Sequence, residues 1–173
     1  EKAITSRTKA IIPVHFAGHP CEMDEIMAIA RSHNLPVIED AAHALPARYR
    51  GKMVGTIGDS TCFSFYATKN MTTGEGGMVT TNNDEWAARI RTMSLHGLSR
   101  DAWNRYTSKG SWAYEILAPG FKYNLTDMQA ALGLAQMSRL EELNKRRAHL
   151  AALYRECLKG LQRINLPGVP GYS

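Results

Sequence analysis

The spacing of apolar residues near the beginning of the chain predicts a strand, a helix and a second strand. Residues 10–16 form a short apolar run typical of a buried strand, and the apolar residues within 22–33 recur at helical spacing. Residues 35–39 form the second short apolar run. A crossover of this kind places its two strands parallel in one sheet, so the pattern predicts an α/β fold.

Two further strands are predicted on either side of a loop that contains a single lysine. Residues 62–66 are rich in aromatic side chains, and residues 78–81 form another short run after the glycine cluster at 74–77. Lys69 lies in the loop between them. The order strand, loop and strand therefore leaves this lysine beside the end of an apolar strand.

The chain after the last predicted strand begins with a helix and continues into a segment without clear periodicity. Residues 82–85 are typical of a helix cap, and the helix that follows carries its apolar residues to near Gly97. No period is evident over residues 98–120. A connection of that length in a compact domain is usually functional or mobile.

Residues 126–159 contain no proline and repeat apolar residues at helical spacing. As one straight helix they would extend about 50 Å. We expect two helices or a bend instead, with Gly133 and Ser138 as the possible bend points. The sequence therefore predicts three parts: residues 1–125 with the predicted strands, a long helical segment over 126–160, and a linker or the start of a further, small domain over 161–173.

Lys69 and Asp40 are the residues of this pattern that could carry chemistry. A lysine held by tight backbone beside an apolar strand loses hydration, which favours the neutral, nucleophilic amine. Asp40 lies just past the carboxyl end of the second predicted strand, where open parallel sheets bind ligands. A reactive lysine with such a carboxylate suits pyridoxal 5′-phosphate (PLP), although a solvated lysine and a turn aspartate are the alternatives.

Several motifs of the chain resemble the DegT/StrS family of PLP-dependent sugar-nucleotide aminotransferases. They follow one another along nearly the whole sequence with the spacing of the family. They are Glu39-Asp40-Ala41-Ala42-His43-Ala44, Gly58-Asp59, Phe63-Ser64-Phe65, Thr68-Lys69-Asn70, Gly74-Glu75-Gly76-Gly77 and the run from Lys122 to Ala131. The resemblance implies a central part of the large three-layer α/β/α domain of a fold-type I PLP-dependent transferase, with a mostly parallel sheet.

The resemblance also implies roles for five residues. Lys69 would be the Schiff-base lysine and the general acid and base, and Asp40 would hold the pyridinium nitrogen of PLP. His43 would lie against the cofactor ring, Ser64 would help to hold the phosphate, and Asn124 would reach the phosphate of the other subunit of a homodimer. The structural alternatives are a core histidine, a solvent-facing serine and an asparagine that only precedes the helix beginning near residue 126.

As a function, the resemblance implies transfer of an amino group, with glutamate as donor, to a nucleotide-linked keto sugar. Members of the family are about twice as long, so we expect a fragment that lacks the small domain and is inactive alone. The alternative is a truncated, noncatalytic paralogue that binds or regulates another subunit.

Composition excludes several other classes of protein. Of the 173 residues, 44% are hydrophobic, which is enough for a core, and the net charge of +5 comes from dispersed basic residues rather than a nucleic-acid-binding cluster. The three cysteines are far apart, and His15 and His19 do not share a helix face, so we expect neither a disulfide framework nor a metal site. No apolar run could cross a membrane, and we expect a cytoplasmic protein.

Overall fold

The computed structural model describes residues 1–99, 115–169 and 171–172. These form two compact units, of which the first is Glu1–Thr80 with Asp127–Ser173 and the second is Thr81–Thr126. Most of the predicted connection over 98–120 lies outside the described residues. The division of the chain at residues 125 and 160 stays a prediction.

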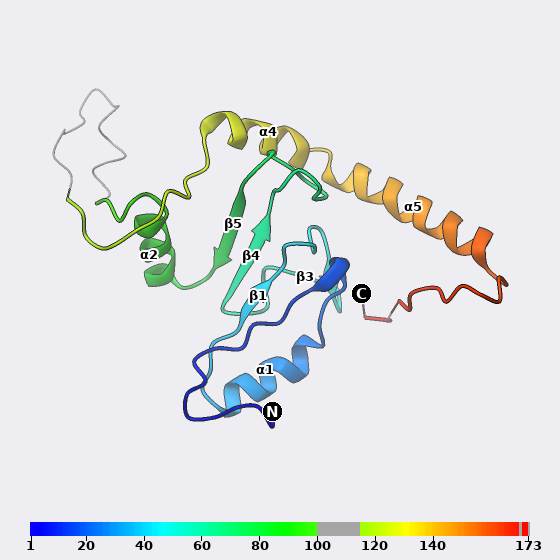
Figure 1. The fold of residues 1–173 in the computed structure, drawn as a ribbon, viewed down its shortest axis with the longest axis horizontal. Helices are drawn as coiled ribbons and strands as arrows, with labels where there is room; N and C mark the ends of the chain where they lie inside the picture. Colours follow the sequence, from blue (N-terminus) through cyan, green and yellow to red (C-terminus); the bar gives the residue numbers. More distant parts are fainter. Residues whose placement is uncertain (100–114, 170, 173) are drawn as a thin grey trace. The chain divides into compact units, whose positions relative to one another are not determined.

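A three-stranded sheet with the order β1-β4-β5 organises the first unit. Its strands are β1 (Ile38–Asp40), β4 (Ser60–Ser64) and β5 (Gly77–Thr81). β1 and β4 are parallel, with Ile38 opposite Ser60 and Asp40 opposite Cys62. Figure 1 shows β5 running in the opposite direction to β4. The α/β fold expected from the sequence is therefore confirmed, with a mixed sheet.

The first predicted strand is present only as two parallel bridges beside β1. These join Ile11 to Val37 and Val14 to Asp40. Pro13 lies between the bridged positions and has no N–H to donate, although its carbonyl accepts from the Asp40 N–H at 2.9 Å. A continuous strand over 10–16 was thus wrong, but the predicted parallel crossover is confirmed.

The helix of this crossover is α1 (Met23–Ser32), which agrees with the predicted helix over 22–33. A short 3-10 turn, η1 (Phe16–Gly18), connects the bridged segment with the approach to this helix. Met23 and Ala30 of α1 pack with Val37 and Tyr49 in a buried apolar cluster. This cluster contributes to the core of the first unit by covering β1.

Tyr49 comes from a hairpin that the apolar pattern did not predict, formed by β2 (Arg48–Tyr49) and β3 (Lys52–Met53). Its two central residues, Arg50 and Gly51, have φ angles of 48° and 80°. Positive φ at both positions is typical of a type I′ turn, whose twist suits two antiparallel strands. Strands of two residues are too short to show a period, which is why sequence analysis missed them.

β4 lies two residues earlier than the strand predicted over 62–66. Ser60 and Thr61 are buried polar residues at its beginning, and Tyr66 beyond its end is exposed. The Tyr66 carbonyl accepts a hydrogen bond from the Lys69 N–H at 3.0 Å. The aromatic residues at the end of the predicted strand therefore already belong to the loop that carries the lysine.

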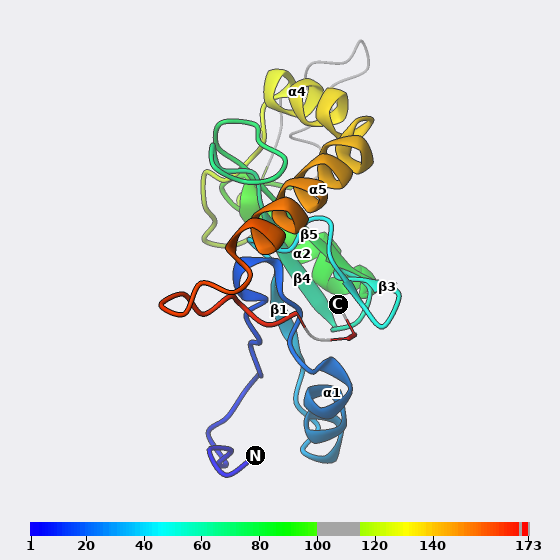
Figure 2. The ribbon, with the colours of Figure 1, turned by 90° about the vertical axis from the view of Figure 1, so that its right-hand side faces the viewer.

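Three longer helices complete the described chain: α2 (Asp84–Ser94), α4 (Asp127–Met137) and α5 (Leu140–Leu158). The Asn83 side chain caps α2 by accepting from the Trp86 N–H at 3.0 Å, as the sequence indicated. The predicted long helix is divided at Ser138 and Arg139, while Gly133 lies inside α4. Figure 2 shows α5 continuing from α4 after this division. None of the helices in the described ranges has the length and apolar character needed to cross a membrane.

Candidate active site

The carboxyl ends of β1 and β4 lie at the same edge of the sheet, because the two strands are parallel. Asp40 ends β1 and Ser64 ends β4. The Ala41 N–H donates to the Cys62 carbonyl at 2.9 Å and extends the pairing by one residue beyond Asp40. Two of the residues singled out in the sequence thus belong to neighbouring strand ends.

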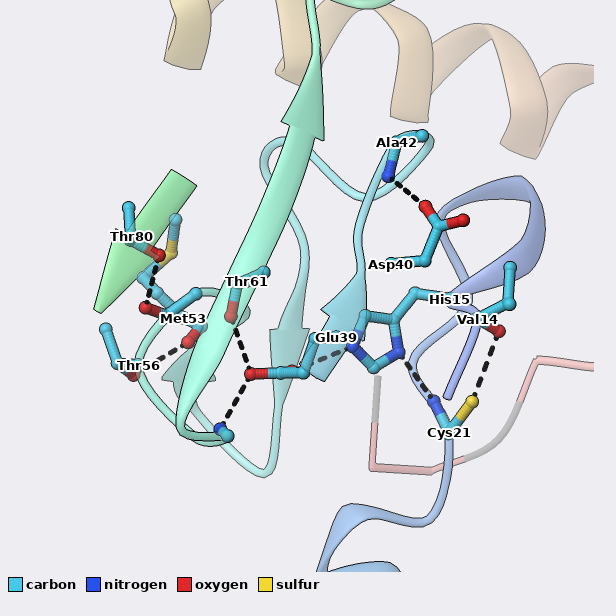
Figure 3. A network of polar contacts seen from close by, with 12 residues as sticks. Val14, His15, Cys21, Glu39, Asp40, Ala42, Met53, Thr56, Thr61 and Thr80 are labelled. Atoms are coloured by element: carbon cyan, nitrogen blue, oxygen red, sulfur yellow. Dashed lines mark hydrogen bonds and ion pairs between the residues drawn. The ribbon is translucent and has the colours of Figure 1, made fainter. Parts of the chain in front are cut away.

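Asp40 is half-buried and holds one of its carboxylate oxygens in a local turn. Its Oδ1 accepts from the Ala42 N–H at 3.0 Å (Figure 3). Among the described residues, no donor meets its Oδ2. The carboxylate is thereby oriented by its own backbone and retains an oxygen that can accept a proton-bearing nitrogen.

Lys69 lies in a loop over residues 65–76, which we call the lysine loop. Its base is closed by the Phe65 N–H, which donates to the Gly76 carbonyl at 2.8 Å, and by the Thr73 N–H, which donates to the Phe65 carbonyl at 2.9 Å. The Lys69 N–H closes an inner turn on Tyr66. The lysine backbone is thus held by hydrogen bonds, and its side chain is half-buried.

The lysine loop is tied directly to the loop that follows Asp40. Asn70 Nδ2 donates to the Leu45 carbonyl at 2.8 Å. Leu45 is two residues beyond His43, and Asn70 is the residue after Lys69. The segments that carry Lys69, Asp40 and His43 therefore meet at one end of the sheet.

His43 and Ser64 make contacts that determine which of their groups can donate. The Ala17 N–H donates to His43 Nδ1 at 3.3 Å, which leaves the proton of the neutral ring on Nε2. The ring is exposed and also contacts Phe16, with 5.8 Å between the ring centroids. Ser64 Oγ accepts from the Tyr66 N–H at 3.3 Å, so its hydroxyl hydrogen can serve another acceptor.

Asn124 belongs to the second unit and is described there by itself. Its Oδ1 accepts from Lys122 Nζ at 2.6 Å. The pair orients the asparagine side chain within its own segment. Its predicted role toward another subunit stays a prediction.

A buried network under the site involves residues to which sequence analysis gave no role. His15 and Glu39 are completely buried, and His15 Nε2 lies 2.8 Å from Glu39 Oε2 (Figure 3). Glu39 Oε1 accepts from the Gly58 N–H at 2.7 Å and from Thr61 Oγ1 at 2.8 Å. The signal in the sequence was a glutamate inside an otherwise apolar run, which must find partners if it is buried.

The protonation of this network follows from its donors. The Cys21 N–H donates to His15 Nδ1 at 3.1 Å, so the ring proton lies on Nε2 and is donated to Glu39. Burial opposes the charge of Glu39, but the hydrogen bonds from His15, Gly58 and Thr61 outweigh it and lower the pKa of that carboxyl. Glu39 is therefore a charged anchor that holds β1 between its neighbours, next to Asp40.

The described residues contain no group of three or more His, Cys, Asp or Glu side chains that could hold a metal ion.

Comparison with known proteins matches nearly the whole chain to one protein family. Residues 1–171 match the model of the DegT/DnrJ/EryC1/StrS aminotransferase family. The chain is 62% identical to the protein MJ1066 of Methanocaldococcus jannaschii, over 98% of this chain and 44% of that protein. It is 54% identical to the spore coat polysaccharide biosynthesis protein SpsC of Bacillus subtilis, over 98% of this chain and 43% of SpsC.

Among solved structures, the chain is similar to Spr1654 of Streptococcus pneumoniae in its PLP form. The TM-score is 0.80 at 36% identity, and the match covers 92% of this chain and 43% of that one. The chain thus spans less than half the length of the relatives that it matches.

Proposed function

The chain belongs to the DegT/DnrJ/EryC1/StrS aminotransferase family, and we propose that it forms part of a PLP-dependent enzyme that aminates a nucleotide-linked keto sugar. Glutamate is the proposed amino donor. The observation that carries the proposal is the hydrogen bond between Asn70 and Leu45, because it joins the lysine loop to the loop that follows Asp40. The name of SpsC supports a carbohydrate substrate, and the PLP form of Spr1654 supports the cofactor.

The side chains at this edge of the sheet fit PLP by their chemistry. Asp40 Oδ2 can accept the proton of the pyridine nitrogen while Oδ1 stays bound to Ala42. The Nε2–H of His43 can donate to the phenolic oxygen, and the Ser64 hydroxyl can donate to the phosphate. When bound, PLP would supply an electron sink for the charge that develops at the reacting carbon.

The residues of the chain would then hold the cofactor and transfer protons. Lys69 would hold the cofactor aldehyde in the resting enzyme and, once released, carry a proton to and from the reacting carbon through Nζ. Asp40 would keep the ring nitrogen protonated. Glutamate would give its amino group to the sugar, lose two electrons and become 2-oxoglutarate. The carbonyl carbon of the sugar would gain these two electrons, so the reaction needs no other oxidant.

We further propose that the enzyme works as a homodimer with a shared site, to which Asn124 contributes across the interface. The resemblance of the run from Lys122 to Ala131 supports this arrangement. Complementation between defective subunits tests the shared site separately from the cofactor chemistry.

The decisive experiment traps the cofactor on the lysine of the full-length protein. The protein is incubated with PLP, reduced with borohydride and digested, and the peptides are examined by mass spectrometry. We expect the PLP mass on the peptide that contains Lys69. Lys69→Ala should lose this label and lower transaminase turnover by at least about a thousandfold, because one residue would serve as both cofactor anchor and proton carrier.

Lys145→Ala is the matched control, since this lysine is exposed on α5. It should keep both the label on Lys69 and the turnover. Transaminase turnover retained in Lys69→Ala, or label spread evenly over many lysines, would refute the proposed role.

A further inference from the structure

Two side-chain amides of α4 bind the lysine loop: Gln129 Nε2 donates to the Glu75 carbonyl at 2.9 Å, and Gln136 binds Thr72. Gln136 Oε1 accepts from the Thr72 N–H at 3.1 Å, and Gln136 Nε2 donates to the carbonyl of the same residue. The amide therefore satisfies both backbone polar groups of Thr72, as a neighbouring strand would. This contact joins positions 64 residues apart in the sequence.

A glycine on the same helix allows this close approach. Gly133 is buried, and a Cβ at this position would lie 3.2 Å from Thr73 Cγ2. Gly133 and Gln136 are three residues apart and so share one face of α4. A glycine inside a helix lowers stability by about 0.5–1 kcal/mol relative to alanine. The close contact with Thr73 explains why a glycine is nevertheless found at this position.

Thr72 is rigidly connected to the base of the lysine loop. Its Oγ1 donates to the Phe65 carbonyl at 3.1 Å and accepts from the Gly74 N–H at 3.0 Å. Met71 and Thr73 on either side of it are 2% and 5% exposed. A displacement of Thr72 would therefore move the backbone that leads to Lys69, three residues earlier.

A second helix contacts the loop next to the lysine. Arg147 of α5 donates from its guanidinium to the Asn70 carbonyl at 3.2 Å. The amide of the same asparagine is bound to Leu45. The backbone after Lys69 is thus held by the loop that follows Asp40 and by residues of α4 and α5.

We infer that Gln136 is a positioning residue, which acts through Thr72 to hold Lys69 Nζ at the place where it meets the cofactor aldehyde. This inference rests on the proposed function and adds a residue of α4 to its site. The amide of Gln136 binds the backbone of Thr72, so it would act on the lysine through the loop and determine how often Lys69 lies in the reactive geometry. Loss of its amide should therefore affect the reactivity of Lys69 more than cofactor affinity.

The test compares Gln136→Met and Gln136→Glu in the full-length protein with Leu134→Met. Methionine preserves the length of the side chain without its hydrogen bonds, and glutamate preserves the acceptor for the Thr72 N–H but loses the donor. Leu134 is 68% exposed on the same helix, so its change to methionine is the matched control. Three quantities are measured: borohydride trapping of PLP on Lys69 at saturating PLP, the dissociation constant for PLP, and hydrogen exchange of residues 65–76.

We expect both Gln136 variants to trap PLP on Lys69 about tenfold more slowly, with the dissociation constant for PLP nearly unchanged. Hydrogen exchange should rise within the lysine loop in both variants, and at the Thr72 amide in Gln136→Met, which lacks the acceptor, but not in β1. Leu134→Met should match the wild type in all three. A general loss of protection that includes β1, or an unchanged trapping rate, would overturn the inference.

The test also separates this inference from the proposed function. Absence of the label on Lys69 in the wild-type protein would refute the proposed function itself, and the inference that rests on it. A labelled wild type with unaltered Gln136 variants would refute only the inference.

Discussion

At the scale of single residues, the candidate site rests on the buried carboxylate of Glu39, which points away from it. Glu39 is completely buried, and three donors surround its carboxylate. A buried carboxylate is tolerated only when such partners replace the lost water. Because Glu39 precedes Asp40 in β1 and their side chains point to opposite faces, the network can anchor Asp40 without contacting a ligand.

Glu39→Gln should lower the free energy of unfolding by about 3 kcal/mol. In either orientation of the amide, the new NH₂ group would face a donor, the Nε2–H of His15 or the N–H of Gly58, in a buried site. Urea unfolding monitored by circular dichroism measures the loss. Glu25→Gln on the exposed side of α1 is the control and should change stability little. Equal stability of the two variants would contradict the anchoring role of Glu39.

The same carboxyl predicts how stability depends on pH. Its pKa is lowered in the folded state, so the unfolded chain binds the proton more readily. The stabilisation is therefore fully present above the ordinary carboxyl range, about pH 4.3, and is lost as the pH falls through the lower folded pKa. Urea unfolding at a series of acidic pH values should show this loss in the wild type and a shallower one in Glu39→Gln. Parallel curves would contradict the assignment.

At the scale of elements, the β2–β3 hairpin shows how the conformation of its turn contributes to the stability of the protein. Gly51 has a φ of 80°, and a Cβ at this position would have open space around it. Gly51→Ala should therefore destabilise the protein by about 1 kcal/mol through backbone strain alone. Gly168→Ala is the control, because its surroundings are also open and its φ lies outside the left-handed region. Thermal unfolding of the two variants distinguishes strain from loss of flexibility.

The lysine loop receives side-chain contacts from both α4 and α5, the two helices into which the predicted long helix is divided. Gln136 and Gly133 lie in the second half of α4, and Arg147 lies in α5. One glutamine and one arginine from two successive helices reach adjacent parts of the same loop. The interruption at Ser138 and Arg139 separates the helices that carry these two contacts.

At the scale of the whole molecule, a shared active site predicts complementation between defective subunits. A heterodimer of a Lys69→Ala subunit and an Asn124→Ala subunit would contain one site with both defects and one with neither. Such heterodimers, purified by two different tags, should recover about half the wild-type turnover. Each variant alone should be inactive or strongly impaired. Absence of recovery in the mixed dimer would indicate that Asn124 serves its own subunit.

Much of the first unit and the main candidate residues could be predicted before the structure. The helical spacing of residues 22–33 and the cap at Asn83 are local features, and both were confirmed. The strand over 10–16 was wrong because one proline interrupted the ladder. The β2–β3 hairpin was missed because its strands are shorter than any readable period.

The sequence by itself determined the candidate chemical groups, since Lys69 and Asp40 are recognised by type and by position after short apolar runs, and their roles stay predictions. Only the tertiary structure decided what holds them. His15 meets Glu39 across 24 residues, and Gln136 meets Thr72 across 64. Hydrophobic periodicity indicates which face of an element is buried, but hydrogen bonds between distant segments depend on how the chain returns to itself, so they became visible only in the fold.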